Sequence, residues 1–460
     1  MSDPSNVARI ERLLLQNFRP FEHLELELHP RLTVLVAENG GGKTTILDAV
    51  SLILQAVLDP LVGKRKHISL SDVRKVTGRH GELVGVYPTA IHAWGSLFGE
   101  TGEWYIARGS ASKADLEENT STARDLKPFL DAAVEYTAGK RAKAPLFPLI
   151  AYYGARRGWE DNQRKVGPWL KRTAQHSGMD RSSGYWDAFT PTHHYLLVRE
   201  WFKRLFSEAR AGQQSLFQSP YEAEKRLAVV QRATDYVLRP VGWHALEWDF
   251  MADTLIATHP QKGRFPVDSL SEGIRSILGV VADLAYRASH LNPHLGEKAA
   301  LESPGIVLID EVDLHLHPRW QQEIISALLE AFPGVQFMVT THSPHVLSSV
   351  EARSIRVLSL DNDAVRVETP RFQTRGVESS DVLAAIMGVD PVPHVEETKL
   401  LREYQTMIEA GQAETEAGLT LRSRLEAHFG AMHPVMLDCE RLLRFKSFKL
   451  RIQAEKKEGG

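Results

Sequence analysis

The chain of 460 residues contains a single cysteine, Cys439, and this scarcity excludes an intrachain disulfide. The net charge is also small, because 55 lysines and arginines are balanced by 58 aspartates and glutamates. Attraction to nucleic acid would therefore have to come from a local patch rather than from the whole chain. No basic N-terminal region is followed by an apolar one, and no apolar run reaches the length of a membrane span. These absences predict a cytoplasmic protein that makes no use of a membrane.

The sequence does contain a glycine-rich segment that follows a short apolar run. Residues 32–36 are apolar, residues 37–45 read Ala-Glu-Asn-Gly-Gly-Gly-Lys-Thr-Thr, and apolar residues recur at helical spacing from Ile46 onward. This order predicts a strand, a phosphate-binding loop and a helix. The glycines let main-chain N–H groups converge on an anion, and the helix start adds its unpaired N–H groups and positive dipole end.

The loop predicts the contacts of a nucleoside triphosphate and Mg²⁺. The Lys43 ammonium can reach the β- and γ-phosphates, and the Thr44 hydroxyl suits Mg²⁺. The usual motif has glycine at the position of Ala37, but the glycines that would face the phosphates remain. We therefore expect the nucleotide to bind to Asn39, Gly40, Gly41, Gly42, Lys43, Thr44 and Thr45. A chance glycine-rich turn is the alternative for this loop taken alone.

Two carboxylates close a second apolar run far downstream of the loop. Residues 305–309 suit a strand buried on both faces of a parallel sheet, and Asp310 and Glu311 follow directly. In a nucleotide site the first carboxylate orients Mg²⁺ through its water shell, and the second accepts a proton from the attacking water. Another apolar run ends at His342, in the position of a contact to the γ-phosphate. These residues predict a catalytic set of Lys43, Glu311 and His342, with Thr44 and Asp310 as metal ligands.

A further short motif, Leu-Ser-Glu-Gly at residues 270–273, precedes a run with helical spacing. Ser271 is a candidate N-cap, and Gly273 leaves the backbone at the helix start accessible to a phosphate. Four such residues mean little on their own, and we do not assign them to the Lys43 site.

The pattern along the chain predicts an α/β protein of several parts, with two nucleotide-binding parts separated in sequence. Residues 1–157 contain the phosphate loop and the short strands of an antiparallel subdomain, and residues 266–370 contain the other motifs. Between them, aromatic and charged residues at helical spacing predict an inserted helical lobe over residues 158–265. A helical C-terminal extension is expected over residues 371–460. The helix after the loop is expected to end at Asp59-Pro60.

Four other groups of residues are candidates for function. Residues 63–80 are rich in lysine and arginine, which suits either a solvated surface or a DNA-facing patch. Residues 156–172 mix basic side chains with tryptophans, which suits either a grip on nucleic acid or a loop that packs its tryptophans inward. Asp361 and Asp363 formally make the D-x-D pair of a nuclease, but Asn-Asp between two strand-like runs favours a hairpin turn. The spacing of His315, His317, His342 and His345 does not favour zinc.

Taken in order, the loop, the Leu-Ser-Glu-Gly motif, the Asp-Glu pair and the strand-terminal histidine resemble the ABC-type ATPase heads of the SMC and RecF class. The resemblance implies a head with a mixed central sheet, an antiparallel β-subdomain, an inserted helical lobe and C-terminal helices. It also implies a homodimer that encloses ATP and Mg²⁺, in which Ser271 and Gly273 complete the site of the other subunit. His317 stands where transporter ATPases have an aspartate, and this variant resembles the OLD-like branch. We find no glutamine for the usual Mg²⁺-sensing loop, which would fall near residues 152–157.

The C-terminal part resembles a narrower family. Residues 379–391, Phe429-Gly430 and His433-Pro434 are similar to the ATPase subunit (PtuA-like) of Septu and related retron antiphage systems. That resemblance implies a slow ATPase that forms higher oligomers and regulates a separate HNH-type nuclease, with no nuclease activity of its own. DNA is left open as a further ligand. The alternatives are a RecF- or SMC-like ATPase of DNA repair or recombination, and a scaffold that binds nucleotide without hydrolysing it.

Overall fold

The computed structural model of the chain describes residues 8–62, 67–112, 116–119, 131, 132, 135, 144–155, 181–189, 194–210, 220–361 and 364–458. It divides into two compact units, Met1–Met387 and Gly388–Gly460, and each has a hydrophobic core of its own. Residues 63–66 and 156–172 of the two basic segments lie outside the described residues, so both interpretations of those segments stay open.

The first unit is built around a six-stranded mixed sheet, here named the central sheet. Its strand order is β16-β15-β3-β14-β13-β9, and neighbouring strands are parallel except for β15 and β16. Four of the strands are buried along their whole length, as the continuous apolar runs predict. The bounds are β3 Leu32–Ala37, β9 Leu149–Tyr153, β13 Gly305–Ile309, β14 Val335–Thr340, β15 Ile355–Asp361 and β16 Ala364–Glu368.

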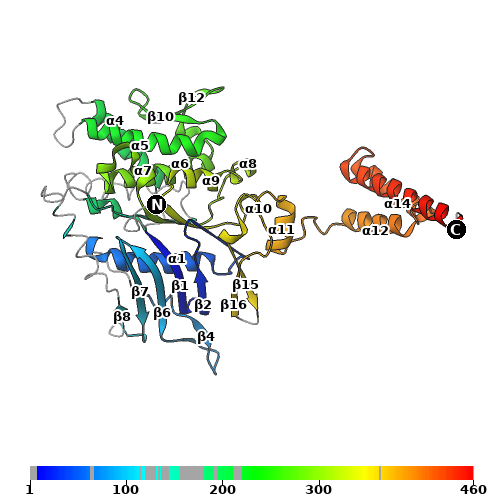
Figure 1. Ribbon diagram of the computed structural model, residues 1–460, viewed down its shortest axis with the longest axis horizontal. Coiled ribbons are helices and arrows are strands. Elements are labelled where there is room, and N and C mark those ends of the chain that lie inside the picture. Colours follow the sequence, from blue (N-terminus) through cyan, green and yellow to red (C-terminus); the bar gives the residue numbers. More distant parts are fainter. Residues whose placement is uncertain are drawn as a thin grey trace. The chain divides into compact units, whose positions relative to one another are not determined.

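An antiparallel sheet lies on one side of the central sheet, with helix α1 (Lys43–Val62) packed between the two (Figure 1). Its strand order is β2-β1-β6-β7-β8. In β2 the buried leucines alternate with exposed polar residues, as in a strand that covers a core with one face only. The bounds are β1 Arg9–Phe18, β2 Phe21–Glu27, β6 Thr89–Leu97, β7 Glu100–Arg108 and β8 Leu116–Asn119.

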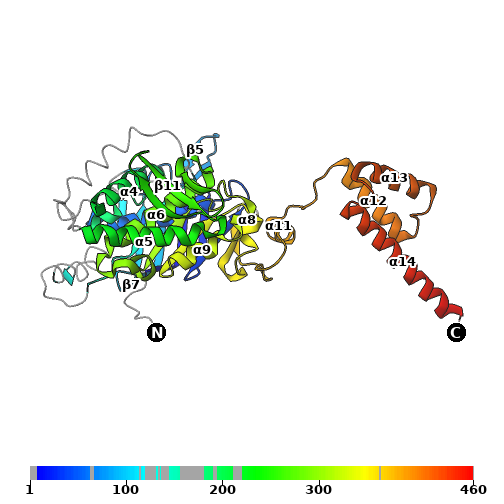
Figure 2. The same cartoon turned by 90° about the horizontal axis from the view of Figure 1, so that it is seen from above.

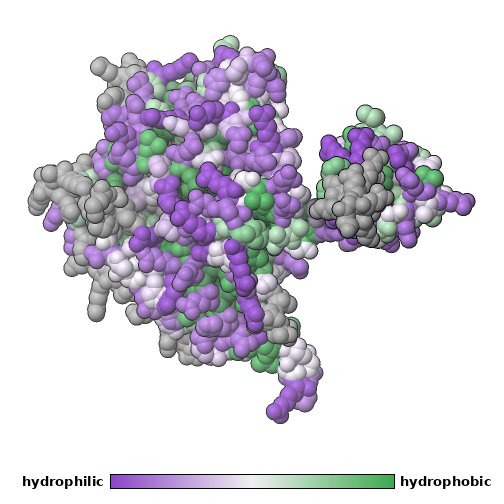
Figure 3. Space-filling view, turned by 45° about the vertical axis from the view of Figure 1, so that its right-hand side comes forward, coloured by the Kyte–Doolittle hydropathy of each residue, from purple (hydrophilic) through white to green (hydrophobic). Residues whose placement is uncertain are grey.

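The described part of the first basic segment leads into a small hairpin of β4 (Lys75–Thr77) and β5 (Leu83–Gly85). Figure 3 shows this hairpin projecting at the bottom of the first unit, with hydrophilic residues at its tip. Arg74, just before β4, forms an ion pair of 3.1 Å with Glu22 and is therefore engaged within the protein.

Helix α1 is the buried helix that follows the phosphate loop. It runs two residues beyond the predicted end at Asp59-Pro60, because Pro60 lies in the last turn, where its missing N–H removes a single helical hydrogen bond. Among the described helices, α1 is long and apolar enough to cross a membrane by length and composition. However, 61% of its apolar window is buried inside the protein, which is typical of the core helix of a soluble fold.

Helices α4 (His194–Arg210), α5 (Pro220–Leu238) and α6 (Glu272–Leu291) pack against one another on the other side of the central sheet (Figures 1 and 2). The lobe predicted to be helical also contains a three-stranded antiparallel sheet in the order β10-β11-β12, and this differs from the prediction. Its strands are too short, and their alternation too broken, to give a clear period of two. They are β10 His244–Asp249, β11 Thr254–His259 and β12 Gly263–Pro266.

Short helical segments complete the described part of the first unit. They are η3 Arg181–Tyr185, η5 Arg239–Val241, η6 Val267–Ser269, η7 Pro293–Lys298, α7 Ala299–Glu302, α8 Pro318–Gln321, α9 Ile324–Ala331, α10 Pro344–Leu347, η8 Ala352–Ser354 and α11 Ser379–Met387. Strands β15 and β16 pair as an antiparallel hairpin from Asp361 and Ala364 outward. The predicted hairpin is therefore present, while residues 362 and 363 at its turn lie outside the described residues.

The second unit consists of helices α12 (Glu396–Ala410), α13 (Glu416–Phe429) and α14 (Pro434–Glu458). Its core is made by Tyr404, Ile408, Ala413, Leu421, Leu425, Met436 and Cys439. The second unit begins at Gly388, and α11 belongs with the first unit, because Val382 of α11 is fully buried in the first core.

Candidate nucleotide-binding site

The predicted motifs meet at one edge of the central sheet. Strands β3, β14 and β13 are parallel and adjacent, so their carboxyl ends lie side by side. The phosphate loop, His342 and the Asp310-Glu311 pair follow these three ends. In open α/β sheets, ligands bind outside the carboxyl ends of the strands, so the fold brings the residues to a suitable place.

The phosphate loop turns through two glycines with positive φ, Gly40 at +80° and Gly42 at +87°. Residues with a Cβ rarely adopt that conformation. A Cβ at Gly42 would lie 2.3 Å from the Phe21 ring, whereas a Cβ at Gly40 would meet no atom within 4 Å. The loop is thus packed against β2 on one side and open on the other.

The departure at Ala37 has a local explanation. A Cβ at Gly41 would lie only 2.7 Å from the Ala37 Cβ. The Ala37 methyl therefore occupies space on the inner side of the loop, and the loop accommodates it because Gly41 has no side chain.

Lys43 is buried, with 7% of its surface exposed, at the first position of α1. Its ammonium donates to the carbonyl oxygens of Ala37 at 2.8 Å and Glu38 at 3.2 Å, and it forms no ion pair with any described residue. Burial lowers the pKa of Lys43, while the carboxylates of Asp310, Glu311 and Asp313 act in the opposite direction. A buried ammonium held only by carbonyl groups fits an anionic phosphate as its counter-charge.

Asp310 is held from two directions at the end of β13. The Thr44 hydroxyl donates to its Oδ2 at 2.9 Å, and the Thr340 hydroxyl donates to its Oδ1 at 2.6 Å. The Thr340 oxygen also accepts the backbone N–H of Glu311 at 2.7 Å. Glu311 has φ of +50°, a strained value for a residue with a side chain, and the residue is partly exposed. One buried hydroxyl thus fixes both residues of the Asp-Glu pair.

The oxygen ligands at this point fit Mg²⁺. Thr44 supplies a hydroxyl and Asp310 a carboxylate, and both are hard oxygen donors. Among the described residues, no three His, Cys, Asp or Glu side chains form a group that would hold a metal unaided. Mg²⁺ in nucleotide sites is usually bound by one or two protein groups together with phosphate oxygens and water, so the sparse set is suitable.

His342 follows β14 at the same edge and is partly buried. Its two neighbours tie this segment to the residues after Glu311. The Thr341 hydroxyl donates to Asp313 at 2.6 Å, and the Ser343 hydroxyl donates to Gln321 at 2.8 Å. The backbone of His342 is therefore fixed relative to the Asp-Glu pair on both sides.

The Leu-Ser-Glu-Gly motif begins α6. Ser271 is the residue before the helix and is exposed, but its side chain makes no capping hydrogen bond, so the proposed N-cap bond is not formed. Glu272 faces His315 at 3.5 Å, and a Cβ at Gly273 would lie 2.2 Å from the His315 carbonyl oxygen. The start of α6 therefore packs against the segment that follows the Asp-Glu pair in the same chain.

The other histidines considered as metal ligands have separate surroundings. His317 caps α8 by accepting the N–H of Arg319. His345 shares a hydrogen bond of 2.8 Å with the Ser379 hydroxyl of α11.

Sequence reasoning missed three residues that shape this site. They are Phe21 under the loop, Thr340 between the carboxylates, and Tyr152, whose hydroxyl donates to Asp48 of α1 at 2.9 Å. No local motif marks them. Tyr152 lies near the position where the glutamine was sought.

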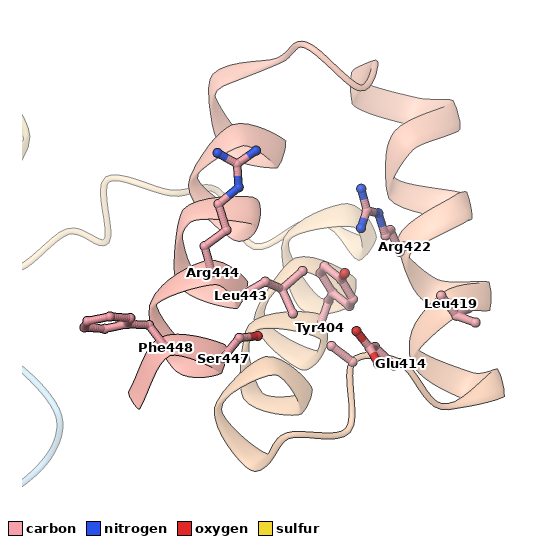
Figure 4. Close-up of a pocket in the computed structure, with 9 residues that line it drawn as sticks. Tyr404, Glu414, Leu419, Arg422, Leu443, Arg444, Ser447 and Phe448 are labelled. Carbon is pink, nitrogen blue, oxygen red and sulfur yellow. The ribbon is translucent and has the colours of Figure 1, made fainter. Parts of the chain in front are cut away.

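A separate cavity of 650 Å³ lies in the second unit, between α12, α13 and α14. Figure 4 shows the Tyr404 ring in its middle, with the side chains of Arg422 and Arg444 on one side and Glu414 on the other. None of the predicted site residues lines this cavity, so it is unrelated to the phosphate loop.

Comparison with known proteins identifies the family. Residues 12–167 match a model described as "AAA domain", and residues 156–348 match a second AAA-domain model whose description includes "AbiEii toxin, Type IV TA system". The chain is 28% identical to the "Retron Ec83 probable ATPase" of Escherichia coli over 92% of this chain and 84% of that protein. It is 30% identical to the Septu protein PtuA of Bacillus thuringiensis over 30% of this chain and 35% of that one. It is 26% identical to the OLD nuclease of Thermus scotoductus over 77% and 62% of the two chains. These matches to retron and Septu ATPases and to an OLD nuclease support an ABC-type ATPase of the class that the motifs predict.

This assignment confirms the family predicted from the motifs, with retron and Septu proteins among its relatives. The fold class is likewise the predicted α/β fold, with a mixed central sheet and an antiparallel sheet beside it. Among solved structures, the SMC head domain from Thermotoga maritima matches with a TM-score of 0.41 and 13% identity, over 79% of this chain and 100% of that one.

Proposed function

We propose that this ABC-type ATPase is an ATP-driven switch, in which two copies close around two ATP molecules and separate after hydrolysis. The observation that carries the proposal is the joint geometry of Lys43, Thr44 and Asp310 at the carboxyl edge of the central sheet. Two sequence-distant elements, the start of α1 and the end of β13, place a buried cation, a hydroxyl and a carboxylate together there. That combination suits a phosphate chain bound with Mg²⁺.

In this proposal the loop residues 39–45 bind the phosphates. Lys43 exchanges its bonds to the Ala37 and Glu38 carbonyls for the β- and γ-phosphate oxygens, at little cost because it is already desolvated. Thr44 and Asp310 would hold Mg²⁺, which when bound neutralises charge on the phosphate oxygens. Thr340 keeps the Asp310 carboxylate aimed at that position.

Glu311 is proposed as the general base. Its backbone N–H is held by the Thr340 hydroxyl, and the residue as a whole is only partly buried, so its carboxylate is proposed to accept a proton from the attacking water. His342 is proposed to contact the γ-phosphate, since its backbone is fixed next to the Asp-Glu pair. Hydrolysis is expected to be slow and to serve switching rather than turnover.

Ser271 and Gly273 are proposed to act across the interface between two copies. The Ser271 hydroxyl is exposed and does not cap its own helix, and α6 is 20 residues long. A long helix whose N-cap side chain makes no capping bond favours an anion at that end. In a closed dimer this end would bind the γ-phosphate held by the Lys43 site of the other copy.

We also propose a biological setting, in which the switch regulates an antiphage complex with a separate HNH-type nuclease in the cytoplasm. The similarity to retron and Septu ATPases supports it. A nuclease within this chain is not expected, because Asp361 belongs to a hairpin strand and the described residues after β16 contain helices without further strands. The relevant assembly is expected to exceed a dimer.

Two substitutions test the switch. Glu311→Gln should bind ATP, lose hydrolysis by about 10²-fold or more, and remain dimeric with ATP, because the missing base blocks only the chemical step. Lys43→Ala should lose ATP binding and should remain monomeric when ATP is added. The readouts are ATP affinity, turnover and mass in solution with and without ATP. The matched control is Glu302→Gln, which removes an exposed carboxylate on α7.

Wild-type hydrolysis by Glu311→Gln would remove the role given to Glu311. An unchanged mass of the wild-type protein with and without ATP would contradict the closing dimer. The setting is tested separately, by co-expression with the neighbouring genes followed by purification. Failure to recover a nuclease partner would contradict the antiphage assignment and leave the nucleotide switch standing.

A further inference from the structure

Strand β9 ends in two adjacent tyrosines, Tyr152 and Tyr153, and its backbone is fixed directly beside the site. The two tyrosines pair in register with Leu308 and Ile309 of β13. The Tyr153 carbonyl then accepts the N–H of Asp310 at 2.8 Å. Because successive side chains of a strand point to opposite faces, one tyrosine faces α1 and the other faces α6.

On the first face, the Tyr152 hydroxyl donates to Asp48 Oδ1 at 2.9 Å. Asp48 lies four residues after Thr44, so it stands one turn along α1 on the same face. Its other oxygen accepts Arg19 Nη1 at 2.5 Å. Burial and the neighbouring Asp48 carboxylate raise the pKa of the Tyr152 hydroxyl, which therefore remains a donor. Tyr152 thus binds the helix that begins with Lys43 and Thr44.

On the second face, the Tyr153 hydroxyl donates to Asp283 Oδ2 at 2.7 Å in the middle of α6. Arg287 Nε donates to the same oxygen at 2.8 Å, and its Nη1 donates to the Gly184 and Trp186 carbonyls at 2.8 and 2.9 Å. These three side chains are almost completely buried. Tyr153 thus binds the helix that begins with the Leu-Ser-Glu-Gly motif.

The two bonds form a continuous connection between two functional ends. The connection runs from Thr44 along α1 to Asp48 and through the Tyr152 and Tyr153 backbone of β9. From there it continues to Asp283 and along α6 to Ser271. The middle of this connection is β9, the edge strand of the central sheet, which is paired along its whole length with β13 and so resists deformation more than a loop does. A displacement of α1 relative to β9 is therefore carried to α6 rather than absorbed.

We propose that Tyr152 and Tyr153 are positioning residues that couple ATP binding at the Lys43 site to the orientation of residues 270–273 on α6. The inference rests on the proposed function and names how the site of one copy is connected to the end that serves the other copy. Neither tyrosine is expected to touch the nucleotide. Their effect is on the chemical step and on closure of the dimer.

The test compares Tyr152→Phe, Tyr153→Phe and the double variant. Each single variant should lower kcat about 5- to 10-fold and weaken ATP-dependent dimerisation, while ATP affinity changes less than about twofold. The double variant should be no worse than the more severe single variant within about twofold, because both bonds belong to one connection. Multiplying effects would overturn the proposal.

Tyr185→Phe is the matched control. Tyr185 is also fully buried, and its hydroxyl donates at 2.9 Å to the Pro148 carbonyl rather than to α1 or α6. It should keep wild-type kcat and dimerisation although it too loses a buried hydroxyl. An equal loss of kcat in this control would reduce the tyrosine pair to a structural role and overturn the proposal.

A hydrogen-exchange measurement keeps the test valid if Tyr153→Phe folds poorly. In the wild-type protein, ATP should change the exchange of residues 270–275, and in Tyr152→Phe that change should disappear although ATP still binds. Wild-type protein that binds ATP without any change at residues 270–275 would overturn the coupling. Wild-type protein that neither binds nor hydrolyses ATP would instead overturn the proposed function, and with it the coupling.

Discussion

At the scale of single residues, Thr340 is the group on which the proposed metal and base positions both depend. Its hydroxyl donates to Asp310 and accepts from the Glu311 N–H, with no exposure to solvent. A buried hydroxyl with two partners costs about 1–3 kcal/mol when it is removed and the partners stay behind. Its loss should therefore affect the aim of the carboxylates more than the binding of phosphate.

Thr340→Val is predicted to keep ATP binding and to lower Mg²⁺-dependent hydrolysis by about 10- to 100-fold, the usual range for groups that orient a metal ligand. Turnover should be measured as a function of Mg²⁺ concentration. Thr340→Ser should restore most of the activity, because it keeps the hydroxyl. Thr234→Val is the control, since Thr234 is equally buried on α5 but donates to helix carbonyls. Full activity in Thr340→Val would contradict the orienting role.

The sequence predicted which residues gather at this edge but not what holds them there. The phosphate loop and the Asp310-Glu311 pair are contiguous motifs at strand ends, so their positions follow from local pattern. Thr340 acts because β14 lies between β3 and β13, and strand order is not encoded in any single segment. The role of Tyr152 is also not visible in the sequence, since its hydrogen-bond partner Asp48 is 104 residues away.

At the scale of elements, the phosphate loop depends on the turn between β1 and β2. Phe21 at the start of β2 fills the space next to Gly42, and Arg19 in the same turn pairs with Asp48 of α1 and with Asp72. Long strands and the helix after the loop are predictable from their periodicity. The packing of the β1–β2 turn against the phosphate loop is not predictable, because neither segment has a periodic pattern.

Gly42→Ala is predicted to destabilise the free protein and to weaken ATP binding. The new Cβ would lie 2.3 Å from the Phe21 ring and would also impose a left-handed backbone, which alone costs about 1–2 kcal/mol. Gly40→Ala is the control, because its backbone is equally left-handed but its Cβ would meet open space. Thermal unfolding of the free protein should rank Gly42→Ala clearly below Gly40→Ala.

A second substitution separates the clash from the backbone strain. In Phe21→Leu/Gly42→Ala the ring atoms that meet the new Cβ are gone, so part of the lost stability and ATP affinity should return. Equal melting temperatures for Gly42→Ala and the double variant would show that the Phe21 ring is not the cause.

At the scale of the whole molecule, the described residues form two separate hydrophobic cores. The first core extends to Val382 of α11, and the second lies within residues 404–439. From sequence, α11 looks like the first of several similar C-terminal helices, and nothing local distinguishes it. What distinguishes α11 from the later helices is that one of its faces is buried against α10. This contact between two helices leaves no mark in the sequence pattern of α11.

Two truncations test this division. A chain that ends after Met387 keeps the first core whole, so it should fold, bind ATP, and melt within about 2 °C of the main transition of the full chain. A chain that ends after residue 371, near the start of the predicted helical extension, loses α11 and exposes the surface that Val382 covers. Burying one such valine is worth about 1.5 kcal/mol or more, and the other contacts of α11 add to that. The chain that ends after residue 371 should therefore melt several degrees below the chain that ends after Met387, as measured by calorimetry. It should also bind ATP more weakly than that longer chain. If both truncations behave alike, α11 belongs energetically with the second unit and the boundary at residue 388 is wrong.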